Sequence, residues 1–201
     1  PLATVRRAAG VRFDLGGIGK GMAADLVADA LCGDGCRSAI VSLGGDVAVR
    51  GDVPDGGFVV PVLDPWTDGV LTSVVLARPG AVVTTSTRRR RWQVQGGGWA
   101  HHVIDPSSGQ PAASDIAAVV AVAAEAWWAE SVAKAALVVG SNSGAALLAE
   151  QGIVQPVYIA SIRSLYLAST TRRFTFRVGV NSPASMVKSL GRRVIFLILS
   201  Y

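Results

Sequence analysis

The chain has 201 residues, of which half are apolar and 23 are glycine. This composition supports the core of one domain rich in turns and strands. The two cysteines, Cys32 and Cys36, lack Cys-x-x-Cys spacing and have no second pair, which argues against structural zinc and leaves a local disulfide as an alternative. The net charge is +5, but residues 151–201 carry +7 without an acidic side chain, so residues 1–150 carry −2. We therefore expect a domain over residues 1–150 and a separate basic segment over residues 151–201.

The first pattern in chain order is a strand, a glycine turn and a helix within residues 11–33. Apolar residues alternate with polar ones over residues 11–15, which predicts a half-buried strand. Four glycines follow within six residues, and apolar residues then recur at helical spacing until Gly33. Such a turn presents backbone N–H groups at a helix N-terminus, which suits an anionic ligand. The alternative is a tight turn that binds nothing.

Neither familiar phosphate loop is present in this turn. The Walker pattern requires Ser or Thr after the lysine, whereas Gly21 follows Lys20. The Gly-x-Gly-x-x-Gly spacing of dinucleotide-binding turns is not met either.

The later strands and helices are predicted from the spacing of apolar residues and from the Gly, Pro and Asp residues that separate them. We expect strands over residues 38–50 (two runs around a Gly-Gly-Asp turn), 58–63, 70–77, 81–86 and 115–124, and helices over 125–139 and 145–151, with 141–144 as a loop. Asp46 of the Gly-Gly-Asp turn is expected to bind its own turn backbone. The apolar run at 194–199 fits a truncated membrane helix, a final core strand or sequence read out of frame.

Two polar stretches lie between the strands expected at residues 81–86 and 115–124. Four arginines at residues 88–91 precede a tryptophan, as at some nucleic-acid surfaces, but no nucleic-acid module is present and we expect a solvated hairpin loop. Residues 99–111 contain both histidines of the chain and an Asp-Pro turn. A neutral imidazole there can accept a proton near pH 7. The alternative is that His102 packs in a strand and Asp105 only caps the turn.

The stretch Asp-Leu-Gly-Gly-Ile-Gly-Lys-Gly-Met-Ala-Ala-Asp over residues 14–25 closely resembles the signature of ApbE-type flavin transferases, which move FMN from FAD onto a protein. Residues 42–46, 81–86 and 102–111 resemble further elements of that family in the same order. The resemblance implies an α+β fold, mostly antiparallel sheet with a few helices, in a single domain. Because family members place about a third of the protein before this signature, we expect the chain to lack its N-terminal part.

The resemblance also implies site residues. Asp14, Lys20 and the backbone of Ile104 would contact FAD, and His102 or Asp105 would help to deprotonate the acceptor hydroxyl. Hydroxyls of Thr85 and Ser86 are further candidates for a phosphate contact, as is an arginine of the 88–91 run for the pyrophosphate.

The resemblance also implies a magnesium site that involves residues within the 125–139 helix. In the family, an Asp and a Thr four residues apart bind Mg²⁺ together with a backbone carbonyl. Here these positions are Glu130, Lys134 and Gly17, and an ammonium group cannot be a metal ligand. Either Glu130 keeps the ion while Lys134 turns toward a phosphate, or Lys134 replaces the charge of the ion, or the two form an ordinary i, i+4 pair.

The function implied by the resemblance is Mg²⁺-assisted transfer of FMN from FAD to a Thr or Ser hydroxyl of an acceptor protein. The alternatives are hydrolysis of FAD to FMN and AMP, FAD binding without turnover, and a basic nucleic-acid or membrane-surface protein built on residues 152–201. We expect an acceptor protein as partner and no nucleic acid, with membrane association left open. The family suggests the extracytoplasmic or membrane-associated side of a bacterial cell, and no signal peptide is visible.

Overall fold

The computed structural model describes residues 4–11, 13–67, 69–160, 165–167 and 194–199. It is a mixed α+β fold, and most of its strand pairs are antiparallel. The main sheet contains seven strands in the order β12-β11-β10-β5-β2-β1-β13. Their bounds are β1 Ser38–Leu43, β2 Asp46–Gly51, β5 Gly80–Ser86, β10 Ile116–Ala123, β11 Val154–Ala160, β12 Leu165–Leu167 and β13 Val194–Leu199.

Three two-stranded hairpins accompany this sheet. They consist of β3 Phe58–Leu63 with β4 Val70–Leu76, β6 Arg91–Gln93 with β7 Trp99–His101, and β8 Ile104–Asp105 with β9 Gln110–Pro111. The strands expected at residues 38–50, 58–63, 70–77, 81–86 and 115–124 are thereby confirmed, because alternating β-branched residues between Gly, Pro and Asp turns are a strong local signal.

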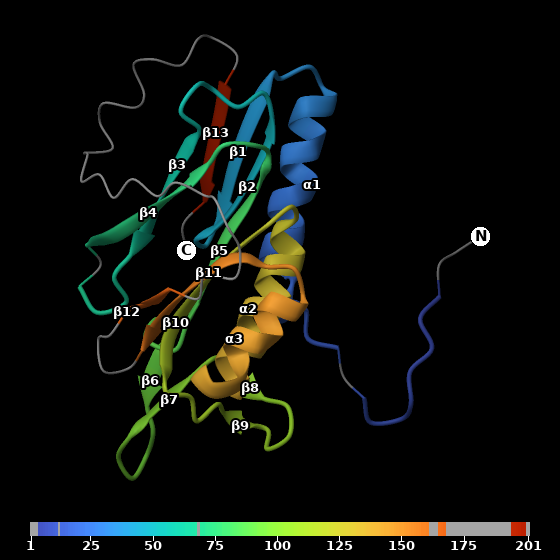
Figure 1. Cartoon of the computed structure of the whole chain (residues 1–201). Helices are drawn as coiled ribbons and strands as arrows, with labels where there is room; N and C mark the ends of the chain where they lie inside the picture. The colour runs from blue at the N-terminus through green and yellow to red at the C-terminus, as the bar shows by residue number, and fades with distance from the viewer. Residues whose placement is uncertain (1–3, 12, 68, 161–164, 168–193, 200–201) are drawn as a thin grey trace.

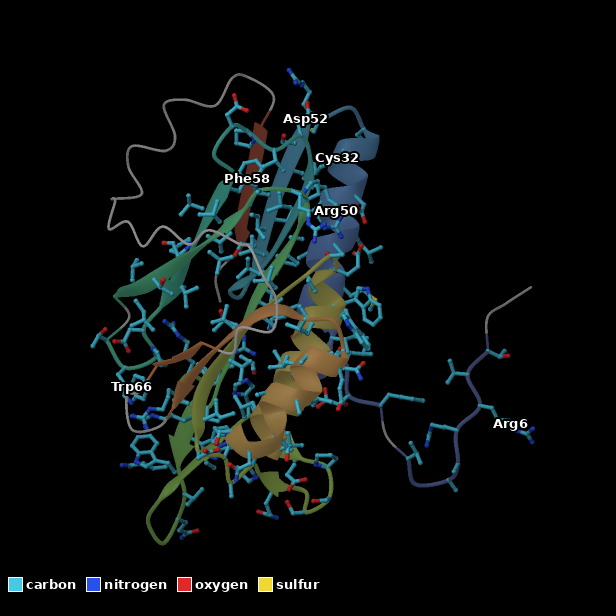
Figure 2. All side chains as sticks on the ribbon, in the orientation of Figure 1. Arg6, Cys32, Arg50, Asp52, Phe58 and Trp66 are labelled. Carbon is cyan, nitrogen blue, oxygen red and sulfur yellow. The ribbon has the colours of Figure 1, made fainter. Side chains whose placement is uncertain are left out.

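The helices cover one face of the main sheet, and the β3–β4 hairpin covers the other (Figure 1). The helices are α1 Gly19–Gly33, α2 Ala126–Val139 and α3 Ser141–Glu150, preceded by the short 3-10 helix η1 Leu15–Gly17. Small side chains such as Ala24, Ala28 and Ala133 let the helices approach the sheet closely, and Val41 and Val119 meet them from β1 and β10. On the opposite face, Phe58 packs between the hairpin and the sheet (Figure 2).

Residues 11 and 13–15 do not form the expected strand. Phe13 and Leu15 are exposed, and Leu15 begins η1. Residues 4–11 run outside the body of the molecule (Figure 1). A strand needs a neighbour to satisfy its backbone, and among the described residues no strand pairs with this segment. The alternation was therefore insufficient evidence.

The loop expected at residues 141–144 is helical. Gly140 precedes α3 at φ 79°, and the Asp115 carboxylate accepts hydrogen bonds from the backbone N–H of Ser141 at 2.9 Å and from its hydroxyl. This carboxylate comes from a residue 26 positions earlier, so local pattern could not indicate the helix start.

The structure chooses among the interpretations of residues 194–199. They form β13, which pairs in parallel with β1 at the edge of the sheet. Within the described part of the chain, no helix has both the length and the apolar character needed to cross a membrane. Cys32 and Cys36 are free thiols, so the local disulfide is not formed.

Candidate functional site

The glycine turn bends the chain so that α1 begins against α2. Asp14 caps η1, and its Oδ1 accepts a hydrogen bond from Gly16 N at 2.7 Å. Ile18, the residue before α1, has no capping side chain, but Glu130 of α2 accepts a hydrogen bond from the amide of Gly21 in the first turn of α1. Gly21 is required there, since a Cβ would lie 2.6 Å from the backbone of Ala126 at the start of α2. The turn therefore fixes the crossing of two helices as well as exposing the amides of a helix end.

An ionic cluster lies beneath this turn and joins three elements of the chain, α1, β2 and α2. Lys20 Nζ pairs with Asp46 and donates to Glu130 Oε1 at 2.8 Å. Lys134 Nζ donates to the same Oε1 at 2.5 Å. Glu130 Oε2 accepts from Gly21 N at 2.8 Å. We call Lys20, Asp46, Glu130 and Lys134 the ionic cluster.

Burial is uneven within the ionic cluster. The side chains of Asp46 and Glu130 are 1% and 2% exposed, whereas those of Lys20 and Lys134 are 27% and 18% exposed. The two carboxylates are thus buried, and the two lysine side chains are the more accessible members of the ionic cluster.

The electrostatics of the cluster follow from this burial. Desolvation raises the pKa of Asp46 to about 6, although Lys20 acts in the opposite direction. Desolvation alone would lower the pKa of Lys20, but pairing with Asp46 and Glu130 raises it overall. Burial lowers the pKa of Lys134, and hydrogen bonds from Lys134, Lys20 and Gly21 outweigh desolvation to lower that of Glu130. At neutral pH, an ionised Asp46 beside a protonated Lys20 agrees with both of their pKa shifts.

The expectation that Asp46 serves its own turn is not met. Its Oδ2 pairs with Lys20, and its Oδ1 accepts from Thr84 N of β5 at 3.4 Å. Asp46 is therefore a member of the site that sequence reasoning missed. Its position at the start of a buried strand, directly after a Gly-Gly turn, was the available signal.

The cluster residues fit a divalent cation poorly. Each oxygen of Glu130 and Asp46 already has a donor, and two donors of Glu130 are ammonium groups. A Mg²⁺ ion on Glu130 would lie about 4 Å from these nitrogens and be repelled by roughly 8 kcal/mol from each at an effective dielectric of 20. Among the described residues no group of three or more His, Cys, Asp or Glu side chains is placed to hold a metal. Gly17 lies in η1, which packs against α2, but contributes only its backbone.

The two histidines have different environments. His101 Nε2 lies 3.2 Å from the Ala112 carbonyl, and because a carbonyl only accepts, this nitrogen carries the proton. His102 is exposed to solvent. Partial desolvation, followed by the positive charges of Arg90 and Lys134, lowers the pKa of His102. The influence of Lys134 indicates that His102 lies near the ionic cluster, and His102 is neutral at pH 7.

Asp105 and Ile104 form β8, next to His102 in the chain. Asp105 Oδ1 accepts from the backbone N–H of Ser107 at 2.8 Å and from its hydroxyl at 2.7 Å. These hydrogen bonds lower the pKa of Asp105. The carboxylate thus orders the Asp-Pro turn, and Ile104 is 45% exposed. Of the predicted site residues, the structure links Lys20 and Glu130 directly and places His102 near Lys134.

A buried hydroxyl also lies on the helix-facing side of the sheet. Thr85 is 5% exposed, and within the described residues its Oγ1 has no hydrogen-bond partner. Thr85 follows Thr84 in β5, so their side chains point to opposite faces of the sheet, and the backbone N–H of Thr84 donates to Asp46. An unsatisfied buried donor costs free energy unless a ligand completes it, which keeps Thr85 as a candidate phosphate contact. Ser86 does not share this property, because its hydroxyl donates to the Ala117 carbonyl at 2.9 Å.

A second ion-pair group stabilises the helix packing. Arg50 Nη2 donates to Asp25 Oδ1 at 2.8 Å and to Glu125 Oε2 at 2.6 Å, and Arg50 Nε donates to Asp29 at 2.7 Å. Asp25 also accepts from Ala126 N and Trp127 N, both at 3.0 Å, at the N-terminus of α2. This group joins β2 to α1 and to the N-terminus of α2.

The chain is thus an α+β domain in which a glycine turn places the N-terminus of α1 beside a buried ionic cluster. The ApbE family model matches residues 3–157, and the chain belongs to the ApbE family. Its α+β fold, mostly antiparallel with helices on one face, is confirmed by solved structures of that family.

The solved structures agree with this fold over most of the chain. The ApbE protein of Thermotoga maritima is 30% identical, with a TM-score of 0.70 over 79% of this chain and 52% of that one. The flavinyl transferase ApbE of Pseudomonas stutzeri is 27% identical, with a TM-score of 0.62 over 78% of this chain and 48% of that one. The chain thus spans about half the length of these structures.

A curated relative matches a shorter stretch. An FAD:protein FMN transferase of Rhodobacter capsulatus is 41% identical over 70 residues, which cover 35% of this chain and 13% of the relative.

Proposed function

We propose that the chain takes part in transfer of FMN from FAD to a Thr or Ser hydroxyl of an acceptor protein. One observation carries this proposal: two partly exposed ammonium groups, Lys20 and Lys134, stand on buried carboxylates at the N-terminus of α1. Such a site favours an anion through both the helix end and the cations. Membership of the ApbE family and the relative named FAD:protein FMN transferase support a flavin dinucleotide as that anion.

In this reaction the acceptor hydroxyl attacks the phosphorus of the FMN half of FAD. The new O–P bond joins FMN to the protein, the pyrophosphate bond breaks, and AMP leaves with the displaced oxygen. The hydroxyl proton passes to a base of the protein. Lys20 and Lys134 would stabilise the negative charge that develops on the phosphates. No step of this reaction depends on Mg²⁺, because both oxygens of Glu130 already accept hydrogen bonds in this chain.

His102 is a better base than Asp105 for this proton. A lowered pKa keeps the His102 imidazole neutral at pH 7, whereas hydrogen bonds to Ser107 make the Asp105 carboxylate a weaker base. Asp14 and the backbone of exposed Ile104 remain proposed FAD contacts, and the acceptor protein itself is identified only by its hydroxyl.

The test incubates the chain with FAD and a Thr-containing acceptor protein, and follows flavin fluorescence that stays with the denatured acceptor. Release of AMP in equal amount, with covalent flavin on the acceptor, is the expected result. Release of AMP and free FMN without labelled acceptor would instead indicate FAD hydrolysis. FAD binding without AMP release would indicate a binding module.

A further inference from the structure

The ionic cluster contains one cation more than the resemblance implies. Lys134 lies one helical turn after Glu130 on α2, at the position where the family has a hydroxyl ligand of Mg²⁺. Its Nζ lies 2.5 Å from Glu130 Oε1, the oxygen that also accepts a hydrogen bond from Lys20. A lysine at this position brings its own positive charge to the point where the ion would bind.

Charge balance points the same way. Two ammonium groups face two carboxylates, so the cluster is neutral without any ion. The buried carboxylates have no oxygen left without a donor. A dication added here would break ion pairs that are already formed and would meet two like charges.

Exposure decides which group faces a ligand. The Glu130 side chain is 2% exposed and the Lys134 side chain is 18% exposed, so Lys134 is the more accessible partner of this pair. An ammonium group has three donors, of which one serves Glu130, leaving others for phosphate oxygens.

We propose that the Lys134 ammonium group, anchored on Glu130, replaces the divalent cation in this chain, so that the site binds the pyrophosphate of a flavin dinucleotide without a metal ion. The identity of the ligand in this inference rests on the proposed function. The absence of a bound metal ion is instead a property of the ionic cluster and can be tested without FAD.

The experiment compares the full chain with its Lys134→Thr and Lys134→Met variants. FAD affinity is measured by flavin fluorescence in EDTA and in millimolar Mg²⁺ at matched ionic strength. The unmodified chain should bind FAD equally in both, within about twofold. Lys134→Thr should bind about tenfold more weakly in EDTA and recover in Mg²⁺, because a hydroxyl beside Glu130 recreates an oxygen site. Lys134→Met, which has neither charge nor oxygen ligand, should weaken equally and not recover.

A second readout does not depend on FAD. Mn²⁺ stands in for Mg²⁺, and its free concentration is followed by electron paramagnetic resonance with the protein alone. The unmodified chain should take up no Mn²⁺, and Lys134→Thr should take it up and show a higher melting temperature with Mg²⁺. If no variant binds FAD, the proposed function fails, and this readout still decides the metal question.

Two results would overturn the inference. One is an unmodified chain whose FAD affinity rises tenfold or more in Mg²⁺, and the other is uptake of stoichiometric Mn²⁺ by the unmodified chain. If the substituted chains do not fold, these two measurements on the unmodified chain decide alone.

Discussion

At the scale of single residues, neighbours in sequence have separated roles. His101 donates to the Ala112 carbonyl and has a buried Nδ1, whereas His102 is exposed near Lys134. Asp105 orders its turn through Ser107. Of the two residues that the sequence offered for proton transfer, His102 and Asp105, His102 therefore has the more suitable surroundings.

His102→Gln should slow FMN transfer by about 100-fold and leave FAD affinity nearly unchanged, because a general base contributes to the rate and little to binding. The pKa of His102 is lowered from 6.5, so the imidazole is neutral above that pH and becomes protonated as the pH falls through the lowered value. Transfer by the unmodified chain should thus be constant above pH 7 and decline in acid. The variant should lose the part of this decline that His102 causes, whereas protonation of Asp46, whose pKa is about 6, should affect both chains. Rates and affinities measured from pH 5 to pH 8 check both points.

His101→Gln is the matched control. Since His101 donates to a backbone carbonyl, this change should lower the melting temperature more than the transfer rate. Equal losses of rate and FAD affinity in His102→Gln would assign His102 a packing role instead.

At the scale of elements, the contact of α1 with α2 positions the whole site. Gly21 permits the close approach, and Asp25 caps α2 from one turn further along α1. Lys20 and Glu130 then meet from the two helices. Small changes in this contact should therefore affect the site as well as stability.

Gly21→Ala should destabilise the protein by about 2–3 kcal/mol, because the added methyl group would lie 2.6 Å from Ala126 backbone atoms that cannot move aside easily. Gly19→Ala is the control at the first position of α1, where the nearest atom is Leu15 Cβ at 3.8 Å. It should be neutral or stabilising by about 0.5–1 kcal/mol. Urea denaturation measures both, and equal effects would show that α1 and α2 lie further apart.

Asp25→Ala should cost about 3 kcal/mol, since it removes the cap of α2 and leaves the largely buried Arg50 without its most buried partner. Asp29→Ala removes another partner of Arg50, but Asp29 is 58% exposed and its loss should cost less than about 1 kcal/mol. The free energy of unfolding distinguishes these changes. A similar cost for both would mean that the cap contributes little.

At the scale of the whole molecule, the described strands after α3 belong to the main sheet. β11 pairs with β10, and Ile153 just before it is 3% exposed in the core. The described strands of residues 151–201 thus share one sheet with strands of residues 1–150. The division into residues 1–150 and 151–201 remains a prediction about origin or role.

A chain shortened to residues 1–160 should fold and bind FAD within about threefold of the full chain, because β1 keeps its pairing with β2 and the ionic cluster lies in residues 20–134. A chain shortened to residues 1–151 should unfold at much lower urea, since it loses β11 and Ile153. Circular dichroism and FAD titration test the pair. Loss of FAD binding by folded 1–160 would show that residues 161–201 contribute to the site.

The sequence by itself determined the features that depend on near neighbours. Alternation and turn residues were sufficient for most strands, glycine and helical spacing for α1 and α2, and the signature at residues 14–25 for the family. Alternation failed at residues 11–15, because a strand also needs a partner that the sequence pattern does not reveal.

Only the tertiary structure decided the composition of the site. The i, i+4 spacing of Glu130 and Lys134 was visible in the sequence and fitted three interpretations equally. Our proposal among them rests on Lys20, Asp46 and the Gly21 amide, which come from distant positions to fill the carboxylate oxygens. Whether a carboxylate is free for a metal ion depends on burial and on donors brought by other elements, and the folded chain alone specifies these.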